Sequence, residues 1–356
     1  MNDRDQHAPF EADVSTGGPL TTGDVITPAP GADPVPGAID IPAVKAGRAR
    51  ASFAQRLERR AGGAAFALCA GLDPSPDALE LLEHAAPAPG TPHRTSEAAR
   101  IERFCGMVIE AVRDHAVAIK PQLAWFEQAG APGMRTLDRV VAYARTANLL
   151  VILDGKRGDV PHSAAAYAEA WLGEDAASGI PGDALTINAA VGADALAAMA
   201  TVAAVRHTAL YALLVTSNPG AAALQAAPLA DGRPWWHLLA GQLADADRIH
   251  GPGVVGAVVG ATRPELLAEA RALLPTSPLL APGVGAQGGR AATLVGTSNP
   301  VSGIALPPTT LVPVSRSLLP TERAGTAGFR FAVGAAAAAL AAELAPPGTE
   351  TDPTVG

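Results

Sequence analysis

The stretch "LLVILDGKRGDV", residues 149–160, places five aliphatic residues directly before a group of four ionisable ones. The aliphatic run has the length and composition of a buried strand. Side chains two apart along a strand point to the same side, so Asp154 and Lys156 are expected on one face. Asp159 follows where the chain leaves the strand, and it could fold back or reach across an interface.

Such a group has a defined acid–base character. A lysine held between two carboxylates keeps its proton, because opposite charges favour the ammonium form. It is then a poor base but a positioned acid, and a carboxylate beside it would repel an anionic substrate group. The combination suits a reaction that expels carbon dioxide and leaves a carbanion for Lys156 to protonate. The alternative is a surface ion pair at a strand end, worth at most about 1 kcal/mol.

Lysine is rare in this chain. Of 26 basic residues only three are lysines, Lys45, Lys120 and Lys156, and the rest are arginines. A desolvated ammonium group can release its proton at accessible pH, whereas a guanidinium group cannot. Lys45 lies in a segment expected to be flexible, but Lys120 and Lys156 both end apolar runs. These two positions are therefore candidates for chemistry that arginine could not perform.

Eight short apolar runs alternate with amphipathic helical segments after residue 50, which is typical of parallel strands with helical crossovers. The pattern predicts the α/β class and a single (β/α)8 TIM barrel over residues 51–345. An open doubly wound sheet is the structural alternative. The runs are residues 65–73, 116–122, 149–156, 183–190, 208–217, 253–262, 277–285 and 309–317.

Polar and charged residues gather at the carboxyl ends of these runs. In a barrel those ends open onto one face, where the loops build the active site. One polar strand end needs no special explanation, but the amino-terminal ends show no such collection of Asp, Lys and Arg. The residues expected to converge are Asp73, Lys120, Asp154, Lys156, Asn188, Ser217, Gly285, Gln287 and Arg316.

The two ends of the chain have a different composition from the barrel. Residues 1–50 are rich in Pro, Gly, Ala and Asp without apolar periodicity and predict a disordered tail. Residues 346–356 are expected to form a flexible carboxyl-terminal tail, and Ser52 is expected to cap a short helix. The start lacks the basic and apolar regions of a signal peptide, so a cytoplasmic location is expected.

Composition also bears on partners and cofactors. A net charge of -8 leaves no broad basic face for nucleic acid or an anionic membrane, so any phosphate must be held by a few local groups. No apolar run is expected to span a membrane, and "FAVGAAAAALAAEL" predicts an alanine-rich helix packed on the barrel. Cys69 and Cys105 fit buried positions in a reducing compartment. Scattered histidines and the absence of Cys-x-x-Cys predict no metal site.

The segment "LDGKRGDV" resembles the Asp-x-Lys-x-x-Asp signature of orotidine 5'-phosphate decarboxylase. The segments "AGLDPSP", "IKPQLAWFE", "LLVTSNPG", "APGVGAQGG" and "VSRSLL" extend the resemblance in the family's order over about residues 51–345. They are most similar to the bacterial subgroup with "KPQ" and "TSNP" segments. The resemblance implies a homodimer with shared active sites that converts orotidine 5'-monophosphate to uridine 5'-monophosphate in de novo pyrimidine biosynthesis, without metal or cofactor.

The resemblance also implies roles for individual residues around the reacting carbon. Asp154 would face the departing carboxylate, Lys156 would protonate C6 of the pyrimidine, and Asp159 would be contributed to the neighbouring subunit's site. Asp73 and Lys120 would hold the ribose hydroxyls, with Lys120 also linked to Asp154. Ser163 would reach the ribose across the dimer.

The remaining roles concern the ends of the nucleotide. Ser217 would bond the pyrimidine amide edge. Gln287, the turn "GVGAQGG" that contains Gly285, and Arg316 would receive the phosphate. This agrees with the residue types, because glycine-rich turns expose N–H groups and arginine offers a bidentate fork.

Two departures and two alternatives remain. The subgroup has a "Pro-Tyr-Leu-Gly"-like turn after the fourth strand, where this chain has "NAAVG" at residues 188–192, and residues 296–308 have no assigned role. A magnesium-dependent sugar-phosphate decarboxylase or aldolase of the same superfamily is one alternative, although "TSNPG" and "GVGAQGG" argue against it. A catalytically silent barrel that binds nucleotide phosphate is the other, although the intact Asp154, Lys156 and Asp159 argue against it.

Overall fold

The computed structural model describes residues 51–82, 97–295 and 309–345, and its strands form one closed barrel. Every strand pairs in parallel with its neighbours in sequence, and the first pairs with the last, so the barrel prediction is confirmed and the open sheet is wrong. Each of the eight apolar runs supplies one strand. The strands are β1 Phe66–Leu72, β2 Ala118–Pro121, β3 Leu150–Arg157, β4 Ala184–Ile187, β5 Ala209–Val215, β6 Val255–Val259, β7 Leu279–Leu280 and β8 Thr310–Val314.

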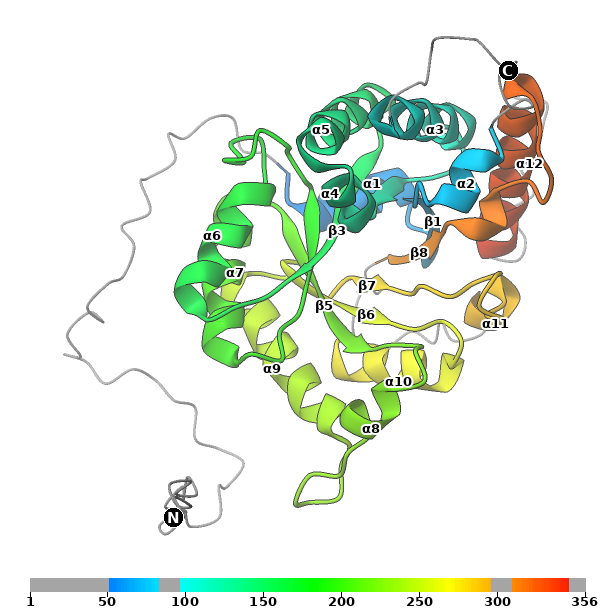
Figure 1. Ribbon diagram of the computed structural model, residues 1–356. Helices are drawn as coiled ribbons and strands as arrows, with labels where there is room; N and C mark the ends of the chain where they lie inside the picture. The colour runs from blue at the N-terminus through cyan, green and yellow to red at the C-terminus, as the bar shows by residue number, and fades with distance from the viewer. Residues whose placement is uncertain (1–50, 83–96, 296–308, 346–356) are drawn as a thin grey trace, which may run out of the picture. The chain divides into compact units, whose positions relative to one another are not determined.

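The strands are largely apolar because both of their faces are covered. All seven residues of β1 are buried, with Ala67 and Cys69 inside the barrel and Leu68 and Ala70 in the outer layer beneath the helices. The helices surround the barrel in a ring (Figure 1). They are α2 Pro76–Glu80, α3 Glu97–Val112, α4 Leu123–Gln128, α5 Gly130–Thr146, α6 Pro161–Trp171, α7 Ala193–Val205, α8 Ala221–Gln225, α9 Trp235–His250, α10 Pro264–Leu273, α11 Ala291–Val295 and α12 Thr326–Leu344.

One further helix, α1 (Phe53–Ala61), closes the amino-terminal end of the barrel. Ser52 caps it as predicted, in a capping box with Gln55. Phe53 and Leu57 pack into the barrel interior, and the Phe53 ring lies edge-on to Tyr211 with centroids 6.0 Å apart. The helix thereby seals the end of the barrel opposite the predicted active site.

The amino-terminal end of the barrel carries more charge than the strand pattern predicted. Arginines on α1 and at the carboxyl ends of α3 and α5 line one cavity together with Asp183, which directly precedes β4. The expectation that Asp, Lys and Arg collect only at the carboxyl ends of the strands is therefore wrong. The strand ends alone did not indicate this cluster, because most of its charges come from helices that the barrel brings together.

The last helix, α12, confirms one expectation and corrects another. Phe329, Val333 and Ala337 are buried, and the helix packs against α3 and β1, as predicted for an alanine-rich barrel helix. Its 19 residues, however, make it long and apolar enough by length and composition to cross a membrane. The expectation that no run reaches that length is wrong, because the helix begins at Thr326, five residues before the quoted apolar stretch.

Cys69 and Cys105 are both buried and unbridged, as predicted. Burial raises the pKa of the Cys69 thiol to about 12, which leaves it a small apolar core residue. The expected tails at residues 1–50 and 346–356 and the expected loop at residues 296–308 lie outside the described residues.

Candidate active site

A cavity of about 280 Å³ opens at the carboxyl ends of the strands. Its walls come from strands β2 to β8, from Asp73 directly after β1, and from the loops after β5 and β7, so residues far apart in the sequence meet there. The predicted convergence is confirmed for most of the named positions. The predicted site residues that line the cavity are Asp73, Lys120, Asp154, Lys156, Ser217, Gln287 and Arg316.

The carboxylate of Asp154 lies between two lysines at the base of this cavity. Lys156 Nζ donates to its Oδ1 at 2.6 Å, and Lys120 Nζ donates to its Oδ2. Thr186 Oγ1 also donates to Oδ1, at 2.8 Å, and Gln122 Nε2 donates to Oδ2 at 3.2 Å. Asp154 is buried, and four donors fix both of its oxygens in place.

The electrostatics follow from this geometry. Burial raises the pKa of Asp154, but the ammonium groups of Lys120 and Lys156 outweigh burial and hold that pKa well below its usual range. Burial lowers the pKa of Lys120, yet Asp154 and then Asp73 outweigh burial and the pKa is raised. The site therefore holds a permanent carboxylate beside a permanent ammonium group. Lys156, whose side chain is 43% exposed, is the member that reaches into the open cavity.

The backbone at Lys156 departs from strand geometry. Its φ is 47°, in the left-handed region that residues other than glycine seldom adopt, and the β3–β4 register shifts between Leu153 and Arg157. Lys156 N–H donates to Thr186 Oγ1 at 3.0 Å instead of to a strand carbonyl. The predicted proximity of Asp154 and Lys156 is confirmed, but a bulge that re-aims the lysine produces it, and not a regular pleat.

The middle of the cavity holds polar atoms suited to a ligand. Oδ1 of Asp73 is buried and accepts no hydrogen bond from the described residues. Ser217 Oγ donates to Gln287 Oε1 at 3.0 Å across the cavity wall. The buried, unpaired Oδ1 of Asp73 lowers the stability of the fold unless a bound group donates a hydrogen bond to it.

The far end of the cavity is formed by the turn after β7 and by the residues after β8. Gly285 has φ +81°, and a Cβ there would lie 2.2 Å from Ser317 Oγ, so only glycine fits. The N–H groups of Gly285, Ala286, Gly288 and Gly289 bond within the protein, so the expectation of many free backbone donors is too generous. The side chain of Arg316 is exposed and makes no hydrogen bond or ion pair with the residues described.

Gly285 and three other named residues do not line the cavity of this single chain. Asp159 accepts a hydrogen bond from Val160 N–H at 2.8 Å, and Ser163 lies in the first turn of α6. No hydrogen bond or ion pair within the described parts of the chain joins Asp159 to Lys156. Asn188 was expected at the mouth but is exposed beside it, where its side chain accepts from Ala190 N–H at 3.1 Å.

Two hydrogen bonds to the Asp154 carboxylate, from the side chains of Gln122 and Thr186, were not predicted. Thr186 shares a strand face with Ala184, whose side chain belongs to the barrel interior, so strict alternation along β4 would have placed it inside. Gln122 directly follows β2 in the "KPQ" segment, where only the lysine had been considered. Both residues are neutral, and a search for charges passes over them.

A sequence model described as the Orotidine 5'-phosphate decarboxylase / HUMPS family matches residues 67–317, which include every strand except part of β1. The chain belongs to this family. A curated orotidine 5'-phosphate decarboxylase from Salinispora tropica is 40% identical over 244 residues, which are 68% of this chain and 82% of that protein. One from Deinococcus radiodurans is 40% identical over 250 residues, or 69% and 82% of the two chains.

Solved structures agree with this family assignment. A Streptomyces avermitilis protein assigned to the same enzyme superposes with a TM-score of 0.68 at 32% identity, covering 83% of this chain and 95% of its own. Leishmania donovani OMP decarboxylase superposes with a TM-score of 0.61 at 29% identity, covering 82% and 98%. The protein is a carboxy-lyase that decarboxylates orotidine 5'-monophosphate to uridine 5'-monophosphate in pyrimidine biosynthesis.

Proposed function

We propose that Lys156 is the proton donor of this decarboxylase and that Asp154 faces the departing carboxylate. The observation that carries the proposal is the buried Asp154 carboxylate held between Lys120 and Lys156, of which Lys156 is the more exposed to the cavity. Asp154 stays ionised because two ammonium groups lower its pKa. A fixed anion beside the substrate carboxylate disfavours the bound ground state, and a fixed ammonium group favours the carbanion.

The step balances in atoms and electrons. The bond between C6 and the carboxylate carbon breaks, carbon dioxide leaves, and the electron pair stays on C6. An N–H bond of the Lys156 ammonium group breaks, and its proton forms the new C6–H bond. The resulting neutral amine then regains a proton from water. An arginine at this position could not complete the step, because guanidinium does not release a proton at accessible pH.

Residues away from the reacting carbon bind the rest of the nucleotide. Asp73, with its unpaired Oδ1, and Lys120 hold the ribose hydroxyls. Ser217 meets the pyrimidine amide edge. Gln287 and Arg316, beside the turn shaped by Gly285, receive the phosphate. Binding energy from these unreactive parts is available to order the site and exclude water around the reacting carbon.

The same proposal includes a cytoplasmic homodimer with shared active sites that needs no cofactor or metal and binds neither nucleic acid nor membrane. Asp159 and Ser163 support sharing, because they lie next to β3 in sequence but do not line this chain's own cavity. Neither side chain is buried, so both are available to a second subunit.

The deciding experiment follows the absorbance of orotidine 5'-monophosphate on mixing with the purified chain in excess EDTA. Conversion by the wild type and its near-complete loss in Lys156→Ala would support the proposed donor. Conversion that stops when EDTA is added would instead support the magnesium-dependent alternative. Binding of the nucleotide without conversion would support the other alternative, a barrel with the altered turn at residues 188–192 that binds the nucleotide but does not catalyse its decarboxylation.

Sharing of the site can be tested by mixing inactive variants. In a Lys156→Ala and Asp159→Ala hybrid dimer, one shared site would carry both defects and the other would be intact. Unfolding and refolding a 1:1 mixture should therefore restore about a quarter of wild-type activity if subunits pair at random. A mixture as inactive as its components would place Asp159 in its own chain's site.

A further inference from the structure

A second cavity lies at the opposite end of the barrel, around α1. Its volume is about 700 Å³, larger than that of the catalytic cavity. The charged and titratable residues lining it are Arg56, Arg59, Arg60, Arg113, Arg145, His115, Asp114 and Asp183. Five arginines and two carboxylates line the cavity. Glu110 and Glu174, which do not line it, approach Arg113 and Arg145, so a small excess of positive charge remains in a chain whose net charge is -8.

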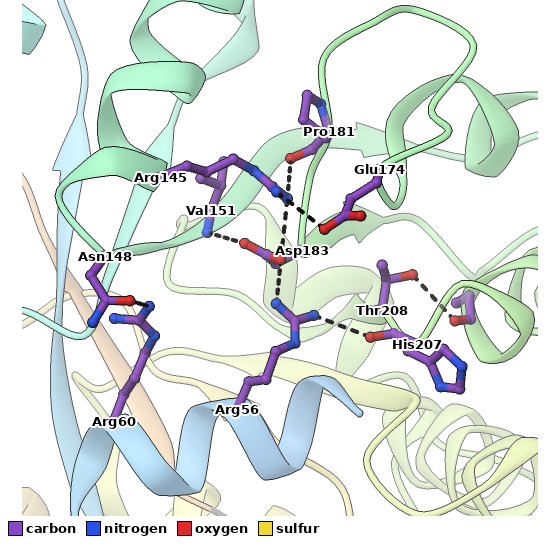
Figure 2. A network of polar contacts seen from close by, with 11 residues as sticks. Arg56, Arg60, Arg145, Asn148, Val151, Glu174, Pro181, Asp183, His207 and Thr208 are labelled. Carbon is purple, nitrogen blue, oxygen red and sulfur yellow. Dashed lines mark hydrogen bonds and ion pairs between the residues drawn. The ribbon is translucent and has the colours of Figure 1, made fainter. Parts of the chain in front are cut away.

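Part of this cluster is fixed by the fold (Figure 2). Asp183 is buried and accepts from Arg56, from Arg145 Nη2 at 3.5 Å and from Val151 N–H at 2.9 Å. Arg56 Nη2 also donates to His207 O at 3.1 Å, and Arg145 Nη2 to Pro181 O at 3.1 Å. These contacts tie α1 and α5 to the start of β3 and β4, and they form a rigid back wall for the cavity.

The other charged contacts of the cavity are looser, and Arg145 Nη1 lies 3.9 Å from the exposed Glu174 carboxylate. Arg60 donates to the neutral side chain of Asn148, and Arg59 has no hydrogen bond or ion pair within the described part of the chain. Arg113 approaches Glu110 and Asp114 only loosely, at 3.7 and 3.9 Å. The Nε atoms of Arg56 and Arg145 are buried without an acceptor among the described residues. Burial lowers the pKa of Arg60, Asp183 opposes this, and the neighbouring Arg56 lowers it further.

We propose that this arginine cavity is a binding site for a polyphosphate chain, of the kind found in inorganic polyphosphates and nucleoside triphosphates. Arginine forks match phosphate oxygens in bidentate geometry, and several forks around one hollow suit several linked phosphates. The volume lies within the range of small-molecule sites and exceeds the need of one phosphate. The site lies at the end of the barrel opposite the catalytic lysines, and its occupation does not depend on the roles proposed for them.

Calorimetric titration of the full-length chain with tripolyphosphate tests this proposal. We expect one equivalent per chain, and at least about tenfold weaker binding in Arg59→Gln/Arg113→Gln, which removes two exposed guanidinium groups. Arg135→Gln, an exposed arginine that lines neither cavity, is the matched control and should bind like the wild type. A parallel titration with adenosine 5'-triphosphate separates a nucleotide ligand, which should bind more tightly, from a bare phosphate chain.

Three results would overturn the proposal. The first is an absence of binding by the wild type, and the second is equal weakening in Arg135→Gln, which would indicate general attraction to surface charge. The third is loss of binding in Arg316→Gln with retention in Arg59→Gln/Arg113→Gln, which would place the anion in the catalytic cavity. Thermal unfolding provides a second measurement, because tripolyphosphate should raise the melting temperature of the wild type but not of the double variant.

Discussion

The two ends of the barrel both hold a buried aspartate between two cations, but the cations differ. At the carboxyl end Asp154 lies between Lys120 and Lys156, and at the amino end Asp183 lies between Arg56 and Arg145. Ammonium groups can exchange protons and guanidinium groups cannot. Under the proposed mechanism, the same arrangement of charges takes part in the reaction at one end, whereas at the other it fastens helices to strands.

Replacing Lys156 should produce the largest effect and separate charge from proton donation. We expect Lys156→Ala and Lys156→Arg both to lower kcat by about 10³-fold or more, because arginine keeps the charge but cannot donate. Steady-state kinetics in EDTA would measure this, with circular dichroism to confirm folding. Substantial activity in Lys156→Arg would show that the positive charge alone suffices.

Neutralising the two aspartates should distinguish the ends most directly. Asp154→Asn and Asp183→Asn should each cost about 3 kcal/mol in the free energy of unfolding, because each leaves buried cations without their anion. Only Asp154→Asn should also abolish turnover. Urea unfolding and kcat measured on the same preparations would check this. A large fall in the kcat of Asp183→Asn would contradict the expectation that only the carboxyl end of the barrel takes part in the reaction.

Arg316 offers a milder test at the carboxyl end, where arginine is expected to bind and not to react. Arg316→Ala should raise KM by about 30-fold, because a hydrogen bond to a charged group contributes roughly 2 kcal/mol. Arg135→Ala, at an exposed position that lines neither cavity, should leave KM unchanged. An unchanged KM in Arg316→Ala would remove this residue from the phosphate site.

The smallest expected effect is the pH dependence of stability. The pKa of Asp154 is lowered on folding, so its contribution is present above about pH 4 and is lost as pH falls further. The pKa of Lys120 is raised, so its contribution is present below about pH 10 and is lost as pH rises through the folded pKa. The difference in unfolding free energy between wild type and Asp154→Asn should be flat from pH 5 to 9 and should shrink at pH 3. If this difference in unfolding free energy changed steadily between pH 5 and 9, a group other than Asp154 and Lys120 would control it.

The sequence predicted the barrel because short, largely apolar runs alternate with helical segments, and these patterns are local. The positions of the two cavity lysines were predictable for the same reason, since Lys120 and Lys156 end apolar runs in an arginine-rich chain. Thr186 and Gln122 were missed because they act through neutral hydrogen bonds, whose partners depend on the register of neighbouring strands. The arginine cavity was missed because its members come from helices and loops more than 80 residues apart, such as Arg60 and Asn148.

The left-handed backbone at Lys156 has a consequence for how this protein would change under selection. That conformation costs a residue with a Cβ roughly 1 kcal/mol, whereas glycine adopts it freely. Lys156→Gly should therefore unfold at a higher temperature than Lys156→Ala, although neither carries an amine. Under selection for heat resistance alone this position would drift to glycine, and only continued demand for the reaction would keep lysine there.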